Sequence, residues 1–163
     1  MEPAYENVVF LTTQEVIVLH DMAIKNWGGR SGLLNFAALD AAVGRVKTAL
    51  SYDEQPDPVH AACLYAHAIS RNHGFADGNK RTAYAAMTTC LAVNGYAIEN
   101  IEPEDMANLI IDLASGSMPL EEFEVLIRDI VRPDPTYQYI KDNDLQSLPS
   151  AAQETDEGLS PSP

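Results

Sequence analysis

The sequence predicts an all-α fold in one compact domain, and three observations support this prediction. Apolar residues recur at spacings of three and four along most of the chain, which is the period of an α-helix. Strand signals are few, and the short run Tyr96-Ala-Ile98 is too short to anchor a sheet by itself. The 163 residues are 46% hydrophobic, which is sufficient for a single core that needs no disulfides.

The N-terminal part contains two predicted amphipathic helices. The first begins after Thr12, because Thr12 and Glu15 have the spacing of a capping box, and it ends at Gly28-Gly29. Its apolar face consists of Val16, Leu19, Ala23 and Trp27. The second helix carries an apolar stripe of the same period, formed by Leu39, Ala42, Val43, Val46 and Leu50. The acidic, proline-flanked segment 51–58 is predicted to be a loop.

Four more helices are predicted in the rest of the domain. Residues 59–71 are apolar on most sides, which predicts a central buried helix. The next helix stops at Asn94-Gly95, and its inward-facing residues are Ala83, Met87, Cys90 and Leu91. Segments 103–114 and 119–131 are amphipathic. Because Cys63 and Cys90 lie in apolar stretches, we expect both to be buried free thiols.

The composition of the chain changes at residue 133. Residues 133–163 contain prolines, serines and six acidic residues against one lysine, which is typical of a segment that is partly or wholly disordered. The sequence therefore divides into a helical domain at 1–132 and an acidic tail at 133–163. Tyr137, Tyr139 and Ile140 could dock the tail on the domain, and a segment that folds on a partner is the alternative to a solvated tail.

The overall charge argues against several classes of partner. A formal charge of −14 would repel nucleic-acid phosphates, so we expect no direct contact with nucleic acid. The first residues are acidic where a secretion signal would be basic, and no apolar run approaches the roughly 18 residues of a membrane span. We therefore expect a cytoplasmic protein without a membrane partner.

The most informative stretch of the chain is His73-Gly-Phe-Ala-Asp-Gly-Asn-Lys-Arg-Thr82. It combines a histidine, a carboxylate, two glycines, an amide and two adjacent cations. Asp77 is the only acidic residue between Pro58 and Ile98, although the chain as a whole is strongly acidic. A local basic cluster beside glycines and a histidine indicates an anion site, and phosphate is the anion that we expect there.

The predicted helices place a tight loop at 74–78 and a helix start near Asn79. A helix start attracts anions through its free N–H groups and its dipole, and Lys80 and Arg81 are unfavourable there unless a phosphate neutralises them. Arg81 could bind two oxygens at once, and Lys80 would act as a point charge. Asn79 could donate to a phosphoryl oxygen.

Three further motif residues have predicted roles. Asp77 is a natural Mg²⁺ ligand when nucleotide phosphates supply the other oxygens. His73 could take a proton from an attacking hydroxyl group. Phe75 is expected to hold the loop against the core.

Each motif residue also has a purely structural interpretation. A histidine at a helix end can be a cap, Asp-Gly is a common turn, and Lys-Arg on a helix is often a solvated face. The joint spacing favours the functional interpretation. The set His60, His67 and His73 does not indicate zinc, since no Cys or Glu lies at ligand spacing. We expect His20 and His67 to pack or to form hydrogen bonds.

The stretch His73-x-Phe75-x-Asp77-Gly78-Asn79-Lys80-Arg81 resembles the signature of the Fic/Doc family, and specifically of its death-on-curing branch. The resemblance also includes Leu11-Thr-Thr-Gln-Glu-Val, Leu19-His20-Asp21, Gly32-Leu33-Leu34, Leu39-Asp40-Ala41-Ala42-Val43 and Asn94-Gly95-Tyr96. It covers about residues 8–132. It implies that 1–132 is a Fic/Doc-like catalytic domain, a compact helical bundle with the motif loop between two central helices.

The details of the motif bear on the reaction. Fic enzymes that transfer AMP typically have glycine at the place of Lys80 and a second arginine at the place of Tyr84. In the death-on-curing branch, the resemblance implies, ATP binds in the reversed orientation. Its γ-phosphate is then transferred to a threonine of translation elongation factor Tu, and translation stops.

The resemblance also implies a role for each motif residue. His73 would activate the target hydroxyl, and Asp77 would position Mg²⁺ or orient that hydroxyl. The phosphates of ATP would be held by Gly78, Asn79, Lys80 and Arg81.

Two alternatives to the kinase remain open. The founding member of the branch has alanine where this chain keeps Gly78, a Fic-like glycine, so AMP or other nucleotidyl transfer is an alternative. A non-catalytic binding module with a Fic/Doc fold is the other, and the intact motif argues against it.

Regulation is expected to come from outside the chain. The family's inhibitory helix, Ser/Thr-x-x-x-Glu-Gly/Asn, has only near matches here, at Ser150 to Thr155 and at Gln153 to Gly158. The resemblance therefore implies an antitoxin supplied in trans, whose helix lies in an apolar groove.

Overall fold

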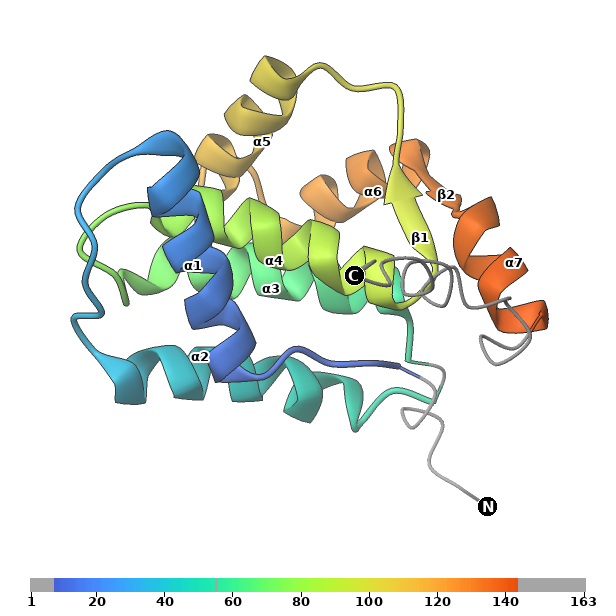
Figure 1. Cartoon of the computed structure of the whole chain (residues 1–163), viewed down its shortest axis with the longest axis horizontal. Coiled ribbons are helices and arrows are strands. Elements are labelled where there is room, and N and C mark those ends of the chain that lie inside the picture. Colours follow the sequence, from blue (N-terminus) through green and yellow to red (C-terminus); the bar gives the residue numbers. More distant parts are fainter. Residues whose placement is uncertain (1–7, 55, 144–163) are drawn as a thin grey trace, which may run out of the picture.

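The computed structural model describes residues 8–54 and 56–143, and these residues form seven helices and two short strands (Figure 1). The helices are α1 Thr13–Trp27, α2 Phe36–Leu50, α3 Pro58–Asn72, α4 Asn79–Val93, α5 Pro103–Ser115, α6 Leu120–Ile130 and α7 Pro135–Asp142. The strands are β1 Tyr96–Ile98 and β2 Val131–Pro133. The predicted all-α class is confirmed, with one small antiparallel sheet added.

The antiparallel pair α3–α4 forms the centre of the molecule. Helix α2 packs on α3, α1 packs on α4, and α5 and α6 cover the remaining sides (Figure 1). The loop that joins α3 to α4 lies at one end of this pair, and the β1–β2 sheet and α7 lie at the opposite end. The motif loop is therefore carried by the two helices with the most extensive packing.

The sequence of α3 explains its central position. Asp57 caps the helix by accepting a hydrogen bond from the N–H of Val59 at 2.9 Å, and Pro58 occupies the first turn, where its missing N–H costs nothing. Small residues such as Ala62 and Ala66 are fully buried, which lets neighbouring helices approach closely. The predicted buried helix at 59–71 is confirmed.

Helix α1 departs from the predicted pattern in one respect. Its capping box between Thr12 and Glu15 is present, and Val16 and Ala23 are buried as expected. Trp27, however, is 77% exposed, whereas His20 is only 1% exposed. The inner face of α1 therefore includes the imidazole of His20, which contacts the motif loop, and Trp27 lies at the edge of a hollow between α1 and α4. Periodicity alone could not show that His20 is buried and Trp27 exposed.

The sheet joins two segments that are distant in sequence. Strand β1 follows α4, β2 follows α6, and their register pairs Tyr96 with Pro133 and Ile98 with Val131. The sequence indicated β1 as an isolated strand signal, and its partner lies more than thirty residues downstream.

Part of the segment predicted to be partly or wholly disordered is helical. Helix α7 begins after Asp134, whose carboxylate accepts from the N–H of Thr136 at 2.9 Å. The ring of Tyr137 lies over Gly95, while Tyr139 and Ile140 are exposed. The remainder of the predicted tail, residues 144–163, lies outside the described residues.

Both cysteines are buried free thiols, as predicted. Burial raises the pKa of Cys90 to about 12 and also raises the pKa of Cys63, so neither thiol ionises readily. None of the described helices combines the length and apolar character needed to cross a membrane.

Candidate functional site

The motif loop is framed by two residues in the left-handed region. His73 ends α3 with φ 54° and ψ 34°, and Gly78 precedes α4 with φ 78°. Positive φ is uncommon for a residue with a side chain, and it tends to persist where function or packing requires it. The His73 side chain is exposed and has no hydrogen-bond partner among the residues that the structure describes.

The connection between α1 and α2 supports the outer side of the motif loop. The N–H of Leu34 donates to the carbonyl of Gly74 at 2.8 Å, and the N–H of Ala76 donates to the carbonyl of Gly32 at 2.9 Å. Leu33 and Phe75 form an isolated antiparallel bridge. These backbone bonds fix the loop against a second segment, so its shape does not depend on α3 and α4 alone.

Phe75 anchors the loop in the core. Its side chain is 2% exposed, and its ring stacks on the imidazole of His20 with centroids 3.8 Å apart and planes only 4° apart. The placement agrees with the structural role that the sequence predicted for Phe75. The histidine partner was expected only to pack or to form a hydrogen bond, and it does both.

Asn79 clamps the loop with its side-chain amide. Its Nδ2 donates to the Phe75 carbonyl at 3.0 Å, and its Oδ1 accepts from the Phe75 N–H at 3.1 Å. The amide oxygen and one amide hydrogen are therefore engaged within the protein. The second Nδ2 hydrogen remains available to donate to a phosphoryl oxygen, which is the role that the sequence predicted for Asn79.

Asp77 presents a charged carboxylate at the surface of the loop. Hydrogen bonds from the N–H groups of Arg30, at 3.2 Å, and Gly78, at 2.7 Å, lower the pKa of this carboxyl, and Arg81 lowers it further. The side chain is 46% exposed. Asp77 is thus ionised and accessible, although Arg30 was not among the residues that the sequence assigned to the site.

Arg81 is tied to the end of α1. Its Nη1 donates to the carbonyl of Gly28 at 2.7 Å, and its Nη2 lies 3.9 Å from the Asp77 carboxylate. A Cβ at Gly29 would lie 2.6 Å from Asp77 Oδ2 and 2.9 Å from Arg81 Nη2. The Gly28-Gly29 pair, predicted only as a helix end, therefore also borders the site.

The start of α4 is suited to an anion. Gly78 provides no side-chain cap, and the first turn contains no acidic residue. The exposed Lys80 has no ion pair within the described part of the chain, and the half-buried Arg81 follows it. Free N–H groups, the helix dipole and two cations thus meet at one place, as the sequence predicted.

An apolar cavity of about 290 Å³ adjoins these cations, between α4 and α5. It is lined by Lys80, Arg81, Tyr84, Met106, Ile110 and Ile111, among others. Tyr84, which stands at the place of the second arginine of AMP-transferring enzymes, is partly exposed on its wall. The cationic start of α4 therefore opens onto an apolar hollow.

A longer groove runs between α1 and α4. Its two hollows, about 430 and 330 Å³, share Leu19 and Thr89. Val18 and Met22 border the groove and are more than half exposed. We call this surface the α1–α4 groove; Arg81 lies at its motif end.

The sequence pattern indicated no role at the site for His20, Gly29 and Arg30. The signal available for His20 was its position as a polar residue within the apolar stripe of α1. Gly29 and Arg30 act through backbone positions, which leave no pattern in a single sequence.

The other histidines lie apart from the motif. Nδ1 of His60 is 2.7 Å from Glu124 Oε2, and burial and the nearby Arg71 lower the pKa of His67. Over residues 8–54 and 56–143, no group of three His, Cys, Asp or Glu side chains is arranged to hold a metal ion. A metal ion at Asp77 would therefore need oxygens from a ligand.

Comparison with known proteins gives a consistent assignment. The model of the Fic/DOC family matches residues 10–91. The chain is 30% identical over 118 residues to "Protein kinase doc" of Escherichia phage P1, an alignment that covers 72% of this chain and 92% of that protein. It is 36% identical over 90 residues to "Toxin Doc" of Mycolicibacterium smegmatis, covering 55% and 67%. The matched region includes the motif, all of α3 and α4 up to Leu91, and the chain belongs to the Fic/DOC family.

Proposed function

We propose that this protein is a death-on-curing toxin that transfers the γ-phosphate of ATP to a hydroxyl group of a protein, a threonine of elongation factor Tu. The observation that carries this proposal is the geometry of the motif loop. One short loop presents a His73 imidazole that bonds to none of the described residues, the ionised Asp77 and the cationic start of α4. The kinase named among the relatives supports phosphate transfer over AMP transfer.

The start of α4 fits the phosphate chain of ATP. Its N–H groups and dipole attract negative charge, Lys80 supplies a point charge, and Arg81 can present two donors to phosphate oxygens. Arg81 would have to exchange its bond to the Gly28 carbonyl for one to phosphate, or keep it and use its remaining donors. With no acid in this turn, nothing on the helix itself competes for the cations.

The reaction then requires one proton acceptor and stabilisation of charge. His73 takes the proton of the threonine hydroxyl as its oxygen attacks the γ-phosphorus. The new oxygen–phosphorus bond forms while the bond to the β,γ-bridging oxygen breaks, and ADP leaves with that electron pair. Lys80, Arg81 and the N–H groups of α4 stabilise the negative charge on the transferred group.

Asp77 is suited to Mg²⁺. Its carboxylate is ionised, and each oxygen keeps a lone pair beyond the backbone bond that it accepts. Mg²⁺ bound with ATP would supply charge neutralisation at the phosphates. The two backbone N–H groups of Arg30 and Gly78 hold the carboxylate in place for this role.

The direct test uses purified protein, Mg²⁺ and elongation factor Tu, with ATP labelled at the γ-phosphate in one reaction and at the α-phosphate in another. Label from γ alone is expected. Replacing His73 with Ala should lower transfer by about a hundredfold or more without unfolding the protein.

The other outcomes of this test separate the alternatives. Label from the α-phosphate would contradict the kinase and indicate AMP transfer, which the glycine at position 78 favours. Label from neither, with ATP still bound, would contradict transfer to this target and leave the binding module.

We further propose that an antitoxin restrains the enzyme from the α1–α4 groove. An amphipathic helix could lay its apolar face along Val18, Leu19 and Met22, in the mode by which helices bind apolar grooves. Because Arg81 lines the motif end of this groove, a helix bound there would also reach the phosphate-binding cations.

A further inference from the structure

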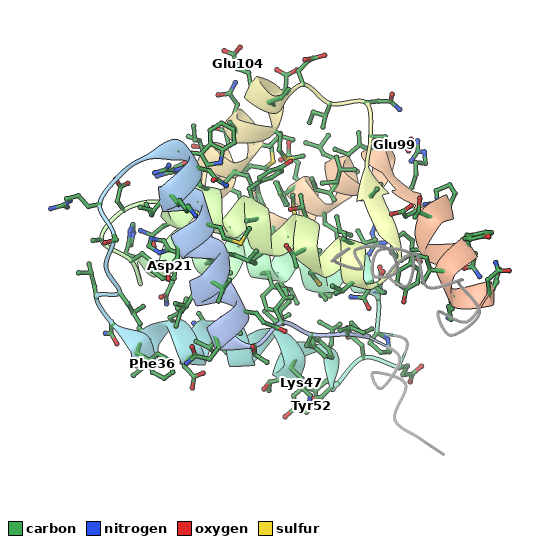
Figure 2. All side chains as sticks on the ribbon, viewed as in Figure 1. Asp21, Phe36, Lys47, Tyr52, Glu99 and Glu104 are labelled. Atoms are coloured by element: carbon green, nitrogen blue, oxygen red, sulfur yellow. The ribbon has the colours of Figure 1, made fainter. Side chains whose placement is uncertain are left out.

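His20 is a buried polar residue that contacts the motif loop at two places. Its ring stacks on Phe75, and its Nε2 lies 2.9 Å from the backbone carbonyl of Asp77. A carbonyl oxygen can only accept, so Nε2 carries a proton and donates it. Figure 2 shows the neighbouring Asp21 on the side of α1 toward the motif loop, and its Oδ1 lies 3.2 Å from the other ring nitrogen, Nδ1.

The carbonyl that His20 holds belongs to the peptide that joins Asp77 to Gly78. In a trans peptide the C=O and the N–H point to opposite sides. Because the carbonyl is directed to His20, the N–H of Gly78 is directed away from it. That N–H donates at 2.7 Å to the Asp77 carboxylate, on the side where Arg81 also lies. It therefore faces the charged side of the site.

Glycine at position 78 makes this orientation easy to lose. Rotating the Asp77–Gly78 peptide by half a turn would change φ of Gly78 from 78° to roughly −100°, and glycine adopts both values readily. The residue that lets α4 start here thus gives the peptide two accessible orientations. Within the loop the Asp77 carboxylate favours one orientation through the Gly78 N–H, and the His20 side chain, from outside the loop, favours the same orientation through the Asp77 carbonyl.

We propose that His20 is a positioning residue that locks the Asp77–Gly78 peptide with its N–H toward the phosphate-binding side. The stacked Phe75 holds the imidazole in the plane needed for the bond, and Asn79 in turn holds Phe75. His20 touches neither ATP nor the target hydroxyl and acts through Gly78. The expected effect of His20 on kcat rests on the proposed function. The expected effect of His20 on the orientation of the Asp77–Gly78 peptide rests on the backbone geometry alone.

The kinetic test compares two variants of the full chain with γ-labelled ATP. His20→Phe keeps an aromatic ring for Phe75 but removes the donor, so kcat should fall about tenfold to a hundredfold, as for other supporting hydrogen bonds. KM for ATP should change less than kcat, because Lys80 and Arg81 remain. His20→Gln restores a donor without the ring, and it should recover part of kcat.

His67→Phe is the matched control, a histidine-to-phenylalanine change on α3 away from the loop, and it should leave kcat unchanged. Equal loss of kcat in His20→Phe and His20→Gln, or loss only in proportion to the fraction unfolded, would overturn the proposal.

A crystal structure of each variant tests the same inference without any reaction. In His20→Phe the Asp77–Gly78 peptide should be rotated or present in two orientations, whereas the wild type and His67→Phe should show one. A single unchanged orientation in His20→Phe would refute the lock even if the kinase assay succeeds. If instead the wild type transfers no phosphate but the peptide rotates in His20→Phe, the proposed function fails and the positioning role stands.

Discussion

The Asp77 carboxylate is exposed and accepts two backbone hydrogen bonds. The effect of its titration on the stability of the protein can be measured. Its pKa is lowered in the folded protein, so its charged form stabilises the fold above the unfolded pKa of about 3.9. This contribution disappears as pH falls through the lower, folded pKa. We expect the difference in unfolding free energy between wild type and Asp77→Asn to be constant from about pH 5 to 7 and to shrink below about pH 4.

Urea unfolding at a series of pH values checks this prediction. A difference that grows as pH falls would mean that the carboxyl is not stabilised in its charged form.

Gly28 and Gly29 offer a matched pair of substitutions beside the site. Both have positive φ, and Gly28 combines it with ψ of −176°, a region that glycine alone adopts readily, so alanine at either costs roughly 1–3 kcal/mol of backbone strain. A Cβ at Gly28 meets nothing within 4 Å, whereas one at Gly29 meets Asp77 and Arg81. Gly29→Ala should therefore lower transferase activity by about tenfold or more, and Gly28→Ala should destabilise the protein similarly with activity retained.

Thermal unfolding and transfer assays on the two variants separate these effects. Equal activity losses would show that the loss comes from the backbone strain that both variants share and not from displacing Asp77 and Arg81.

Most residues of the site could be predicted from the sequence, because their chemistry lies in one contiguous motif. His73, Asp77 and the two cations need only a loop followed by a helix to come together. His20 could not be found in this way, because its role depends on the packing of α1 against the loop. The contact of Gly29 with Asp77 depends likewise on how a distant segment crosses the motif.

At the scale of elements, the α1–α4 groove is an apolar surface whose occupant can be tested. Met22 is 53% exposed, so Met22→Glu should leave the fold intact while placing a charge where an apolar helix face would bind. We expect it to weaken antitoxin binding by about tenfold or more, as for other interface anchors, and to leave phosphate transfer unchanged.

Binding of the antitoxin measured by calorimetry tests this expectation. Tyr52→Glu is the control: Tyr52 is exposed at the end of α2, lines none of the hollows described above and is labelled in Figure 2. Undiminished binding by Met22→Glu would place the antitoxin elsewhere.

The elements themselves were predictable to different degrees. Local signals were sufficient where they are strong, as at the Thr12 capping box and in the apolar stripe of α2. They failed where a distant partner decides the outcome. Strand β1 exists because Val131–Pro133 pairs with it, and Trp27 is exposed because it borders a hollow between α1 and α4 instead of packing in the core. Neither fact can be read from local periodicity.

At the scale of the whole molecule, the candidate site lies at one end of the α3–α4 pair and α7 lies at the other. Helix α4 has 15 residues and is therefore about 22 Å long. The docking of Tyr137 on Gly95 is separated from the motif by this length. Changes at that end should affect stability without altering the chemistry.

Gly95→Ala tests this separation. The new Cβ would lie 2.6 Å from the Tyr137 ring, and φ of 88° disfavours alanine, so the unfolding free energy should fall by roughly 1–2 kcal/mol or more. Tyr137→Ala removes the ring without the backbone strain and should cost less. Both variants should keep the kcat of the wild type at temperatures where they remain folded. A lower kcat in Tyr137→Ala, at unchanged fraction folded, would instead mean that α7 influences the motif loop through α4, because no other described contact of that ring reaches the site.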